Sequence, residues 1–508
     1  MTEVLAVDGR SLSLEQFLEV TRAGRPVALA EAARPGIDAS RRTVERAVQA
    51  GRPVYGVTTG FGGLSHQVIP AAESRALQLS LLRSHASGTG PALPSDVVRG
   101  LLLLRANALS RGHSGVRREL VERLLEFLNQ GLVPFVPEQG SVGASGDLAP
   151  LAHLSLTLVG EGEFVTSSAH RAPAGEILRR LGIPPLELAE KEGVALINGT
   201  SLMTSYLAFS VADGRELLAA AEIAAALSFD ALRANPTSLD DRLGALRHLP
   251  EQRAVADAMR RLIQGSQLAV AGGEWQGQDP YTLRCIPQVL AATRQGLDYA
   301  ERVLTSELNA ISDNPLVFGD DEFVSGGNFH GQTLALALDA LAIALHYLGA
   351  FAERRVARLV NPALSRGLPA FLATTPGRSS GFMIPQYLAA ALVNENQSLV
   401  HPASAGSLPT SADQEDFVSM GAWAGWKLRR LIANVQRIVA IEWIVAGQAL
   451  EHHRPRTGGA GSEAAWQALR ERVAAWSEDR SPAADIERVA AGIADGTLVR
   501  SVRAVVPF

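Results

Sequence analysis

The stretch that decides the fold reads LALALDALAIALHYLGAFA and covers residues 334 to 352. It is apolar almost throughout, and Asp339 and His346 within it and Glu353 directly after it are each seven residues apart. That spacing places them on one narrow stripe of a helix from Gln332 to about Val360. Nearly every other face is apolar, which is typical of a helix buried in a large core or between subunits. The sequence therefore predicts a central bundle of long helices.

Size and composition point to a globular protein with much internal or intersubunit surface. The chain has 508 residues, of which 47% are hydrophobic and 19% charged, and its formal charge is −5. No block of Lys and Arg appears, so we expect no nucleic-acid partner. The single cysteine, Cys285, excludes an internal disulfide and indicates a reducing compartment.

Targeting and membrane signals are not found in the sequence. The N-terminus has neither a basic start nor an apolar core, so it does not resemble a signal peptide. The longest uncharged run, residues 193 to 212, contains Asn, Ser and Thr and is too polar to span a bilayer. We expect a soluble cytoplasmic protein with no membrane partner.

A second informative stretch, GSVGASGDLAPL, covers residues 140 to 151 and places Ser145 between very small neighbours. Asp147 is a favourable N-cap, Pro150 is tolerated in a first helical turn, and leucines follow at helical spacing. The preceding segment VPFVP, residues 133 to 137, cannot be helical. We therefore expect Ser145 on a tight loop before a helix that Asp147 caps.

The tripeptide Ala144-Ser145-Gly146 can react with itself if the fold compresses this loop. An amide nitrogen is normally a poor nucleophile because its lone pair is delocalised. Gly146, however, has no side chain to keep its nitrogen away from the Ala144 carbonyl. Ring closure with loss of two waters would turn Ser145 into an exocyclic methylene on an imidazolone, an electrophile that no ordinary side chain supplies. The tripeptide is common in ordinary loops, so the rest of the sequence has to indicate whether this one cyclises.

The whole run closely resembles the signature of the aromatic amino acid ammonia-lyases, in which Ala-Ser-Gly becomes 4-methylidene-imidazol-5-one (MIO). The resemblance extends from about Val54 to Glu442. It implies a mainly α fold, a long-helix bundle of the ammonia-lyase (fumarase/aspartase-like) type with a small mixed N-terminal region. It also implies a homotetramer with shared active sites. We expect an N-terminal domain bearing the loop at residues 1–199, followed at 200–508 by the bundle and a C-terminal region with two peripheral helices.

Two further motifs carry candidate catalytic residues. The glycine-rich run YGVTTGFGG, residues 55 to 63, lacks the lysine of a phosphate-binding loop and instead predicts a mobile loop that carries Tyr55. The resemblance gives this tyrosine a part in proton transfer. Asn198 can be an ordinary turn residue, whereas the resemblance makes it a hydrogen-bond partner of the prosthetic ring.

The run QDPYTLRC, residues 278 to 285, also resembles a family motif. Arg284 can be a surface charge, but its planar fork suits capture of a substrate carboxylate. The resemblance implies that Tyr281 and Gln278 face the amino group and the prosthetic ring. It makes Phe329 a pocket wall, where an ordinary core aromatic is the alternative.

Three positions bear on the substrate. His85 is either a hydrogen-bonded structural residue or a working one. By resemblance, Ser84-His85 is similar to histidine lyases and to some tyrosine aminomutases. Glu415 in this family accompanies histidine substrates, whereas phenylalanine and tyrosine enzymes more often carry asparagine or glutamine. Phe417 departs from the pattern, because histidine lyases often have histidine there.

These residues predict the elimination of ammonia from L-histidine to give trans-urocanate. The electrophile would bind the substrate amine, and Tyr55 with help from Glu415 would remove the β-proton. No metal is expected, because the acidic run at residues 320 to 322 lacks accompanying histidines. Nothing predicts a bound nucleotide.

Four alternatives remain open. One is a phenylalanine or tyrosine ammonia-lyase, although these enzymes tend to carry His-Leu or Phe-Leu in place of Ser84-His85. An aromatic aminomutase fits Ser84-His85, but Gln414-Glu415 argues against it. The fumarase and aspartase group shares the helical plan, but its Gly-Ser-Ser-x-Met-Pro loop is absent from the sequence. An inactive structural or binding protein on a lyase scaffold is disfavoured, because the candidate catalytic residues are retained.

Overall fold

The structure is a computed structural model that describes residues 3–64, 66–70, 73–167, 170–271 and 277–508. The chain forms two compact units. The first comprises Met1–Phe209, Glu301–Asp339 and Pro402–Trp426, and the second comprises Ser210–Ala300, Ala340–His401 and Lys427–Phe508. The sequence places one boundary after residue 199, whereas the first unit also takes in two later segments of the chain.

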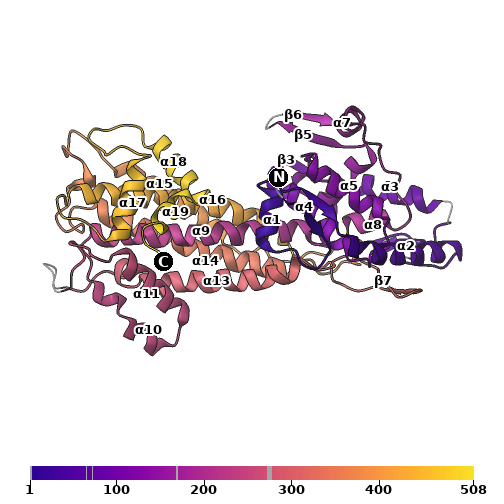
Figure 1. The fold of residues 1–508 in the computed structure, drawn as a ribbon, viewed down its shortest axis with the longest axis horizontal. Helices are drawn as coiled ribbons and strands as arrows, with labels where there is room; N and C mark the ends of the chain where they lie inside the picture. The colour runs from indigo at the N-terminus through magenta and orange to yellow at the C-terminus, as the bar shows by residue number, and fades with distance from the viewer. Residues whose placement is uncertain (1–2, 65, 71–72, 168–169, 272–276) are drawn as a thin grey trace. The chain divides into compact units, whose positions relative to one another are not determined.

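The first unit is built mostly from short helices (Figure 1). They are α1 (Leu14–Thr21), α2 (Arg34–Gln49), α3 (Ser74–His85), α4 (Ser95–Ser110), α5 (Arg118–Asn129), α6 (Leu148–Leu156), α7 (Ala174–Leu181) and α8 (Glu192–Ile197). Helix α4 lies in the core of this unit, because almost all of its side chains are buried. Helix α1 begins with a capping box in which Ser13 and Gln16 bond each other's backbone N–H, at 3.2 and 3.0 Å.

Strands in this unit form small two-stranded sheets. They are β1 (Leu5–Val7), β2 (Val27–Leu29), β3 (Thr89–Ala92), β4 (Pro137–Gln139), β5 (Glu163–Ser167), β6 (His170–Pro173), β7 (Leu316–Phe318) and β8 (Glu322–Val324). Strands β1 and β2 pair in parallel, with Leu5 opposite Val27, and the other three pairs are antiparallel. The predicted small mixed region is therefore present in the N-terminal part of the chain.

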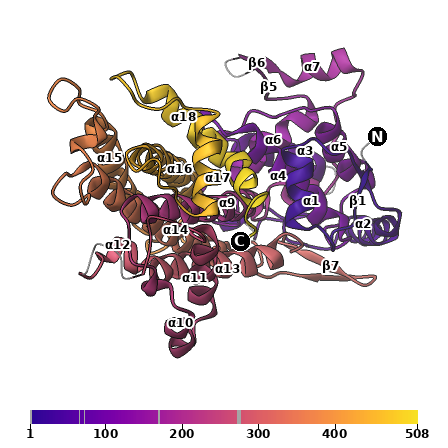
Figure 2. The same ribbon diagram turned by 60° about the vertical axis from the view of Figure 1, so that its left-hand side comes forward.

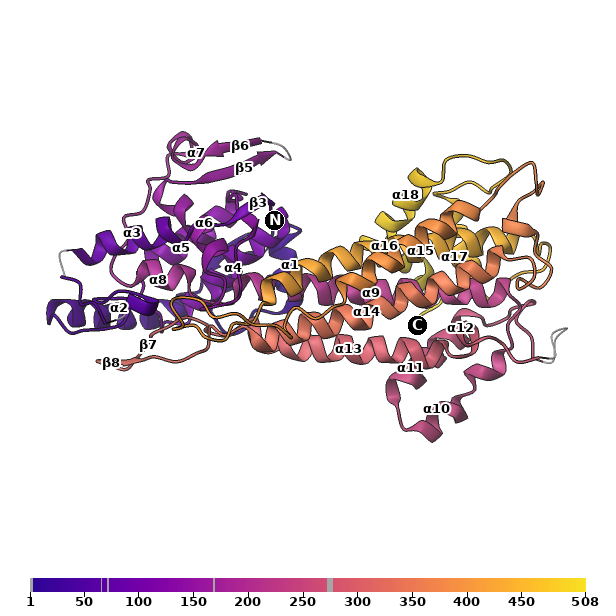
Figure 3. The same cartoon turned by 180° about the vertical axis from the view of Figure 1, so that it is seen from behind.

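Long helices dominate the second unit (Figure 3). They are α9 (Ser201–Ala231), α13 (Ile286–Glu307), α14 (Gln332–Val360), α15 (Met383–Leu399) and α16 (Gly421–Glu451). Their inner faces are joined by buried polar contacts as well as by apolar packing. Glu442 on α16 accepts a hydrogen bond from Arg355 Nη2 at 2.8 Å and one from Ser228 Oγ at 2.6 Å. The predicted mainly α, long-helix fold is confirmed.

Helix α14 has the predicted bounds, but its exposed stripe is not the predicted one. Asp339 and Glu353 are 3% and 2% exposed, because Ser404 N and Gln386 Nε2 donate hydrogen bonds to their carboxylates. Apolar side chains face outward instead, with Leu336 53% and Tyr347 41% exposed. Among the described residues α14 alone is long and apolar enough to cross a membrane, and 61% of its most apolar window is buried within the structure.

Smaller helices complete the second unit (Figure 2). They are α10 (Asp241–Arg247), α11 (Pro250–Leu262), α12 (Tyr281–Arg284), α17 (Ala460–Arg470), α18 (Ala483–Ala494) and α19 (Thr497–Arg503). The prediction of two peripheral helices at the C-terminal end is wrong, because three are present. Gly496, at φ +70°, turns the chain between α18 and α19 and divides what otherwise reads as one helix.

Candidate active site

The loop that carries Ser145 is tightly turned. Gly143, Ser145 and Gly146 have φ values of 72°, 51° and 84°, all in the left-handed region. That conformation is unusual for a serine and costs energy. It brings the loop so close to the segment after α8 that a Cβ on Gly146 would lie 2.2 Å from the Gly199 oxygen. Glycine is therefore required at this position.

Asn198 and Gly199 hold the loop from one side. Asn198 Nδ2 donates to the Ser145 carbonyl oxygen at 2.7 Å. Gly146 and Gly199 form an isolated parallel β-bridge, and Asp147 N donates to the Gly199 oxygen at 2.7 Å. Asn198 Oδ1 is buried and has no hydrogen-bond partner among the described residues.

Glu415 approaches Ser145 from the other side. Ser145 Oγ donates to Glu415 Oε1 at 2.8 Å, and Thr410 Oγ1 donates to Oε2 at 3.0 Å. The Glu415 loop turns back on itself at Ser411, Ala412 and Asp413, which have positive φ values, and Thr410 and Glu415 form a β-bridge at its base. Ser145 is thus bonded through both its hydroxyl and its carbonyl group.

A cavity of about 850 Å³ opens over Ser145. This volume suits a small organic ligand. The cavity brings together these predicted residues: Tyr55, His85, Ser145, Asn198, Phe329 and Glu415. A smaller cavity of about 270 Å³ is lined by Ala144 and Gly146, and it shares His85 and Glu415 with the first.

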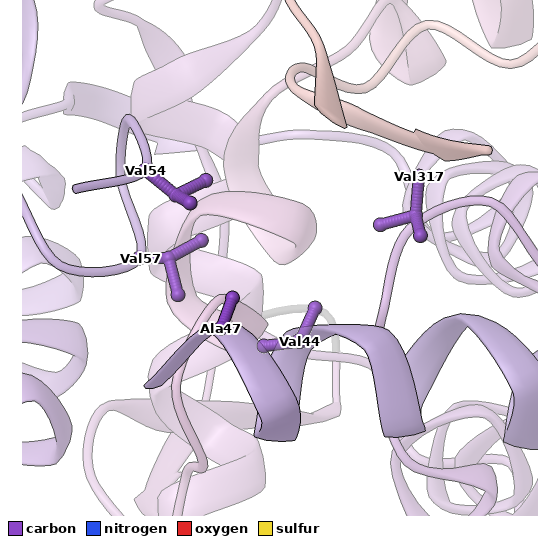
Figure 4. Close-up of a cluster of buried hydrophobic side chains, with 5 residues drawn as sticks. All are labelled: Val44, Ala47, Val54, Val57 and Val317. Atoms are coloured by element: carbon purple, nitrogen blue, oxygen red, sulfur yellow. The ribbon is translucent and has the colours of Figure 1, made fainter. Parts of the chain in front are cut away.

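Tyr55 enters the cavity from the glycine-rich loop. Its hydroxyl oxygen accepts a hydrogen bond from Gly62 N at 3.2 Å. The neighbouring Val54 and Val57 are buried and anchor the loop in an apolar cluster, which Figure 4 shows. The other members of the cluster are Val44 and Ala47 of α2 and Val317 of β7. A rigid anchor on either side of Tyr55 therefore fixes where this side chain enters the site.

His85 is the last residue of α3 and is half-buried in the cavity wall. Its Nδ1 lies 2.9 Å from the Leu81 oxygen and 3.0 Å from Ser84 Oγ. Burial lowers the pKa of His85 below its ordinary value, although the hydrogen bond to Leu81 and the charge of Glu415 act in the opposite direction. The lowered pKa favours the neutral ring, and Nδ1 donates to the Leu81 oxygen because a carbonyl oxygen can only accept.

Asp147 has a different role from the predicted one. Its side chain makes no cap hydrogen bond to α6. Instead Oδ2 accepts from the N–H groups of Leu202 and Met203, at 2.8 and 3.2 Å, in the first turn of α9. Burial raises the pKa of Asp147 to about 7, and these hydrogen bonds, with one from Ser141, oppose that rise. Asp147 therefore ties the Ser145 loop to the first turn of α9.

Gln278, Tyr281 and Arg284 are not among the residues that line the cavity, and they belong to the second unit. Gln278 is exposed and Tyr281 is 68% exposed. The Arg284 guanidinium lies 4.9 Å from the centre of the Tyr281 ring and donates to the Asp279 oxygen. Tyr281 and Arg284 thus contact each other, and none of the three predicted residues lines the cavity over Ser145 within this chain.

Phe417 is 58% exposed and does not line the cavity. Its ring is nearly parallel to that of His330, with 6.1 Å between the ring centres. In the acidic run at residues 320 to 322, Asp321 forms an ion pair with Arg52 at 2.9 Å. Within the described part of the chain, no cluster of three metal-ligating side chains is found.

One buried residue of the site escaped the sequence analysis. Arg105 of α4 is fully buried and donates from Nη1 to the Asn198 oxygen at 2.7 Å. The sequence contains a signal for it, because a single charge interrupts the apolar run LLLLRANAL, residues 101 to 109. A charge in the middle of a buried helix is rare unless it is paired or functional.

Comparison with known proteins agrees with this geometry. The model of the aromatic amino acid lyase family matches residues 12–471. Over 498 residues the chain is 53% identical to histidine ammonia-lyase of Symbiobacterium thermophilum, with 98% of each chain covered. The fold matches the crystal structure of histidine ammonia-lyase from Trypanosoma cruzi with a TM-score of 0.91 and 40% identity, over 99% of this chain and 96% of that one. It matches tyrosine aminomutase from Streptomyces globisporus with a TM-score of 0.94 and 37% identity, over 100% and 99%. The chain therefore belongs to the aromatic amino acid lyase family.

Proposed function

We propose that this protein eliminates ammonia from L-histidine to give trans-urocanate, using an MIO group formed from Ala144, Ser145 and Gly146. One observation carries the proposal. Ser145 is held at its carbonyl by Asn198 and at its hydroxyl by Glu415, inside a cavity that also contains Tyr55. The curated relatives named histidine ammonia-lyase, 46 to 53% identical to this chain, support histidine as the substrate.

The residues around Ser145 fit an MIO group. The loop is tightly turned, with positive φ at Gly143, Ser145 and Gly146, and Gly146 has no side chain that would obstruct ring closure. Asn198 would hold the ring through the Ser145 carbonyl oxygen, and its unpaired Oδ1 is a further buried polar atom at the site. Once formed, the group supplies an electrophilic carbon that binds the substrate amine and makes it a better leaving group.

Tyr55 is the base in this proposal. The β-proton of an amino acid is weakly acidic, so a positioned base is needed. The N–H of Gly62 points at the Tyr55 hydroxyl oxygen and would stabilise negative charge there. Glu415 would assist the proton transfer, and with the neutral His85 it would address the imidazole of the substrate.

A tyrosine-specific enzyme is the second candidate. The match to tyrosine aminomutase is as close in fold as that to histidine ammonia-lyase. Phe417 stands where histidine lyases often have histidine. Glu415, placed beside Ser145, favours histidine, because a carboxylate can form a charged pair with a protonated imidazole, whereas a neutral phenol offers it only a hydrogen bond.

We further propose a cytoplasmic homotetramer whose sites are shared between copies. The exposed apolar stripe on α14, together with exposed Ile384 and Tyr387 on α15, supports an extensive contact with another copy. Gln278, Tyr281 and Arg284 would then complete the cavity of a neighbouring copy, with Arg284 binding the substrate carboxylate. A single reduced cysteine suits a cytoplasmic location.

Initial rates with histidine, tyrosine and phenylalanine test the substrate, with the ultraviolet spectrum of each product recorded. Histidine should give urocanate at the highest kcat/KM. Turnover of tyrosine with histidine inert would overturn the substrate assignment. Intact-mass spectrometry tests the prosthetic group independently, because a matured chain is lighter than its sequence by two waters. A chain at full sequence mass in active protein would refute MIO chemistry.

A further inference from the structure

Arg105 is a buried cation with little to hold it in place. It lies on α4, is 0% exposed, and uses only Nη1 in a hydrogen bond, while Nε and Nη2 have no partner among the described residues. Desolvation lowers the pKa of Arg105, and only the charge of Asp313 opposes this. One hydrogen bond returns less free energy than the desolvation of a guanidinium costs. Stability alone therefore does not account for an arginine here.

The single bond that Arg105 makes reaches the residue that holds Ser145. It fixes the Asn198 carbonyl, and the next carbonyl, that of Gly199, is fixed by Asp147 N at 2.7 Å. The guanidinium also packs against the backbone, since a Cβ on Gly199 would lie 2.5 Å from Nη1. With its backbone held in this way, Asn198 directs Nδ2 at the Ser145 carbonyl oxygen. The position of that donor therefore depends on Arg105.

The charge of Arg105 is not cancelled by its neighbours. Lys191 and Asp313 form a 2.8 Å ion pair in which both side chains are 0% exposed. Arg105 lies within the field of both groups, because its charge lowers the pKa of Lys191 and Asp313 opposes the desolvation of Arg105. Among these three side chains, two cations and one carboxylate leave one net positive charge. In a buried site such a charge acts strongly on developing negative charge.

We propose that Arg105 is a positioning residue for maturation of the Ser145 loop, which holds Asn198 in place and stabilises negative charge on the Ser145 carbonyl oxygen. The inference rests on the proposed function. In the second dehydration the Cα proton and the hydroxyl group of Ser145 leave together as one water. The electron pair of the Cα–H bond becomes the new Cα=Cβ bond. Negative charge spreads onto the adjacent carbonyl oxygen during this step, where the Asn198 N–H meets it.

The test is a time course of intact mass on freshly refolded protein. Arg105→Met should lose its two waters at least about tenfold more slowly than the wild type, since it removes the support of an oxyanion donor. Arg105→Lys keeps the charge and should mature faster than Arg105→Gln, which keeps only a donor. Arg99→Met is the matched control. Arg99 lies on the same helix and donates to the carbonyls of Val20, Thr21 and Leu128, away from the loop.

The outcomes distinguish a failure of this inference from a failure of the proposed function. Maturation of Arg105→Met at the wild-type rate would overturn the inference while leaving the proposed function intact. A wild-type chain that never loses the two waters would overturn both. If Arg105→Gln matures as fast as Arg105→Lys, the positive charge of Arg105 has no part in maturation, and the charge-stabilising part of the inference fails. Circular dichroism at the time of measurement establishes that the variants are folded, and if Arg105→Met does not fold, the Lys and Gln variants decide.

The kinetic constants of the matured chains provide a second readout. Once all chains are matured, Arg105→Lys should show a lower kcat with little change in its KM for histidine. The reason is that Arg105 supports Asn198 and touches no substrate-binding side chain. A raised KM with unchanged kcat would contradict a positioning role.

Discussion

The contact between Gly146 and Gly199 supports a quantitative prediction for Gly146→Ala. The left-handed φ of 84° costs an alanine about 1 kcal/mol. Its Cβ would also lie 2.2 Å from the Gly199 oxygen, about 1.2 Å inside an ordinary contact, and the obstacle is backbone that cannot rotate away. Relieving the clash separates the two segments and breaks the 2.7 Å bond from Asp147 N to that oxygen, which costs about 1–3 kcal/mol when the groups stay buried. We expect a total loss of about 2–4 kcal/mol and no maturation.

Gly131→Ala isolates the conformational part of this cost. Gly131 has a φ of 66°, and nothing lies within 4 Å of the position that its Cβ would occupy. Chemical denaturation followed by circular dichroism should therefore show a loss of only about 1 kcal/mol for this variant. Intact mass measures maturation in the same samples. Equal destabilisation of the two variants, or a matured Gly146→Ala chain, would refute the reasoning.

Four further perturbations have expected outcomes. Tyr55→Phe should lower kcat by about 10²–10⁴-fold with full loss of the two waters, measured by stopped assay and intact mass; unchanged kcat would exclude Tyr55 as the base. Glu415→Gln should reduce the rate with histidine more than that with tyrosine, and an unchanged ratio in paired initial-rate assays would remove Glu415 from substrate selection. Because the folded-state pKa of Asp147, about 7, exceeds the unfolded value of 3.8, its contribution to stability should fall as pH rises from 4 to 7. Relative to the wild type, the free energy of unfolding of Asp147→Asn should therefore rise by up to roughly 4 kcal/mol between pH 4 and 7, measured by thermal melts at stepped pH. Parallel pH dependences of the two proteins would contradict the raised pKa. Lys191→Met should lose about 3–5 kcal/mol by leaving Asp313 buried and unpaired, and the double variant with Asp313→Leu should recover much of that loss in the same melts.

Local patterns predicted the elements of the fold well. The bounds of α14 agree with the helix predicted from Gln332 to about Val360 around the apolar run at residues 334 to 352, and the loop before α6 follows from glycine and proline punctuation. The residues around Ser145 were found through the family resemblance. No local rule predicts that Asn198 meets Ser145 across 53 residues or that Glu415 meets it across 270.

The errors share one physical cause, which is that a polar residue does not reveal its partner. Asp147 suits an N-cap, but its carboxylate bonds the first turn of α9 instead. Asp339 and Glu353 suit an exposed stripe, yet Ser404 and Gln386 from distant segments satisfy them in the interior. Sequence spacing gives the face of a helix, and only the tertiary structure shows what that face meets.

The 270 positions that separate Ser145 from Glu415 also determine when, during synthesis, both groups that bond Ser145 are present. A ribosome has made most of the chain before Glu415 emerges, so a nascent or truncated polypeptide lacks one of the two groups that clamp the serine. Glu415 also lines the cavity over Ser145, so such a fragment lacks part of the cavity wall as well. Under the function that we propose, a complete site exists only when synthesis is nearly finished.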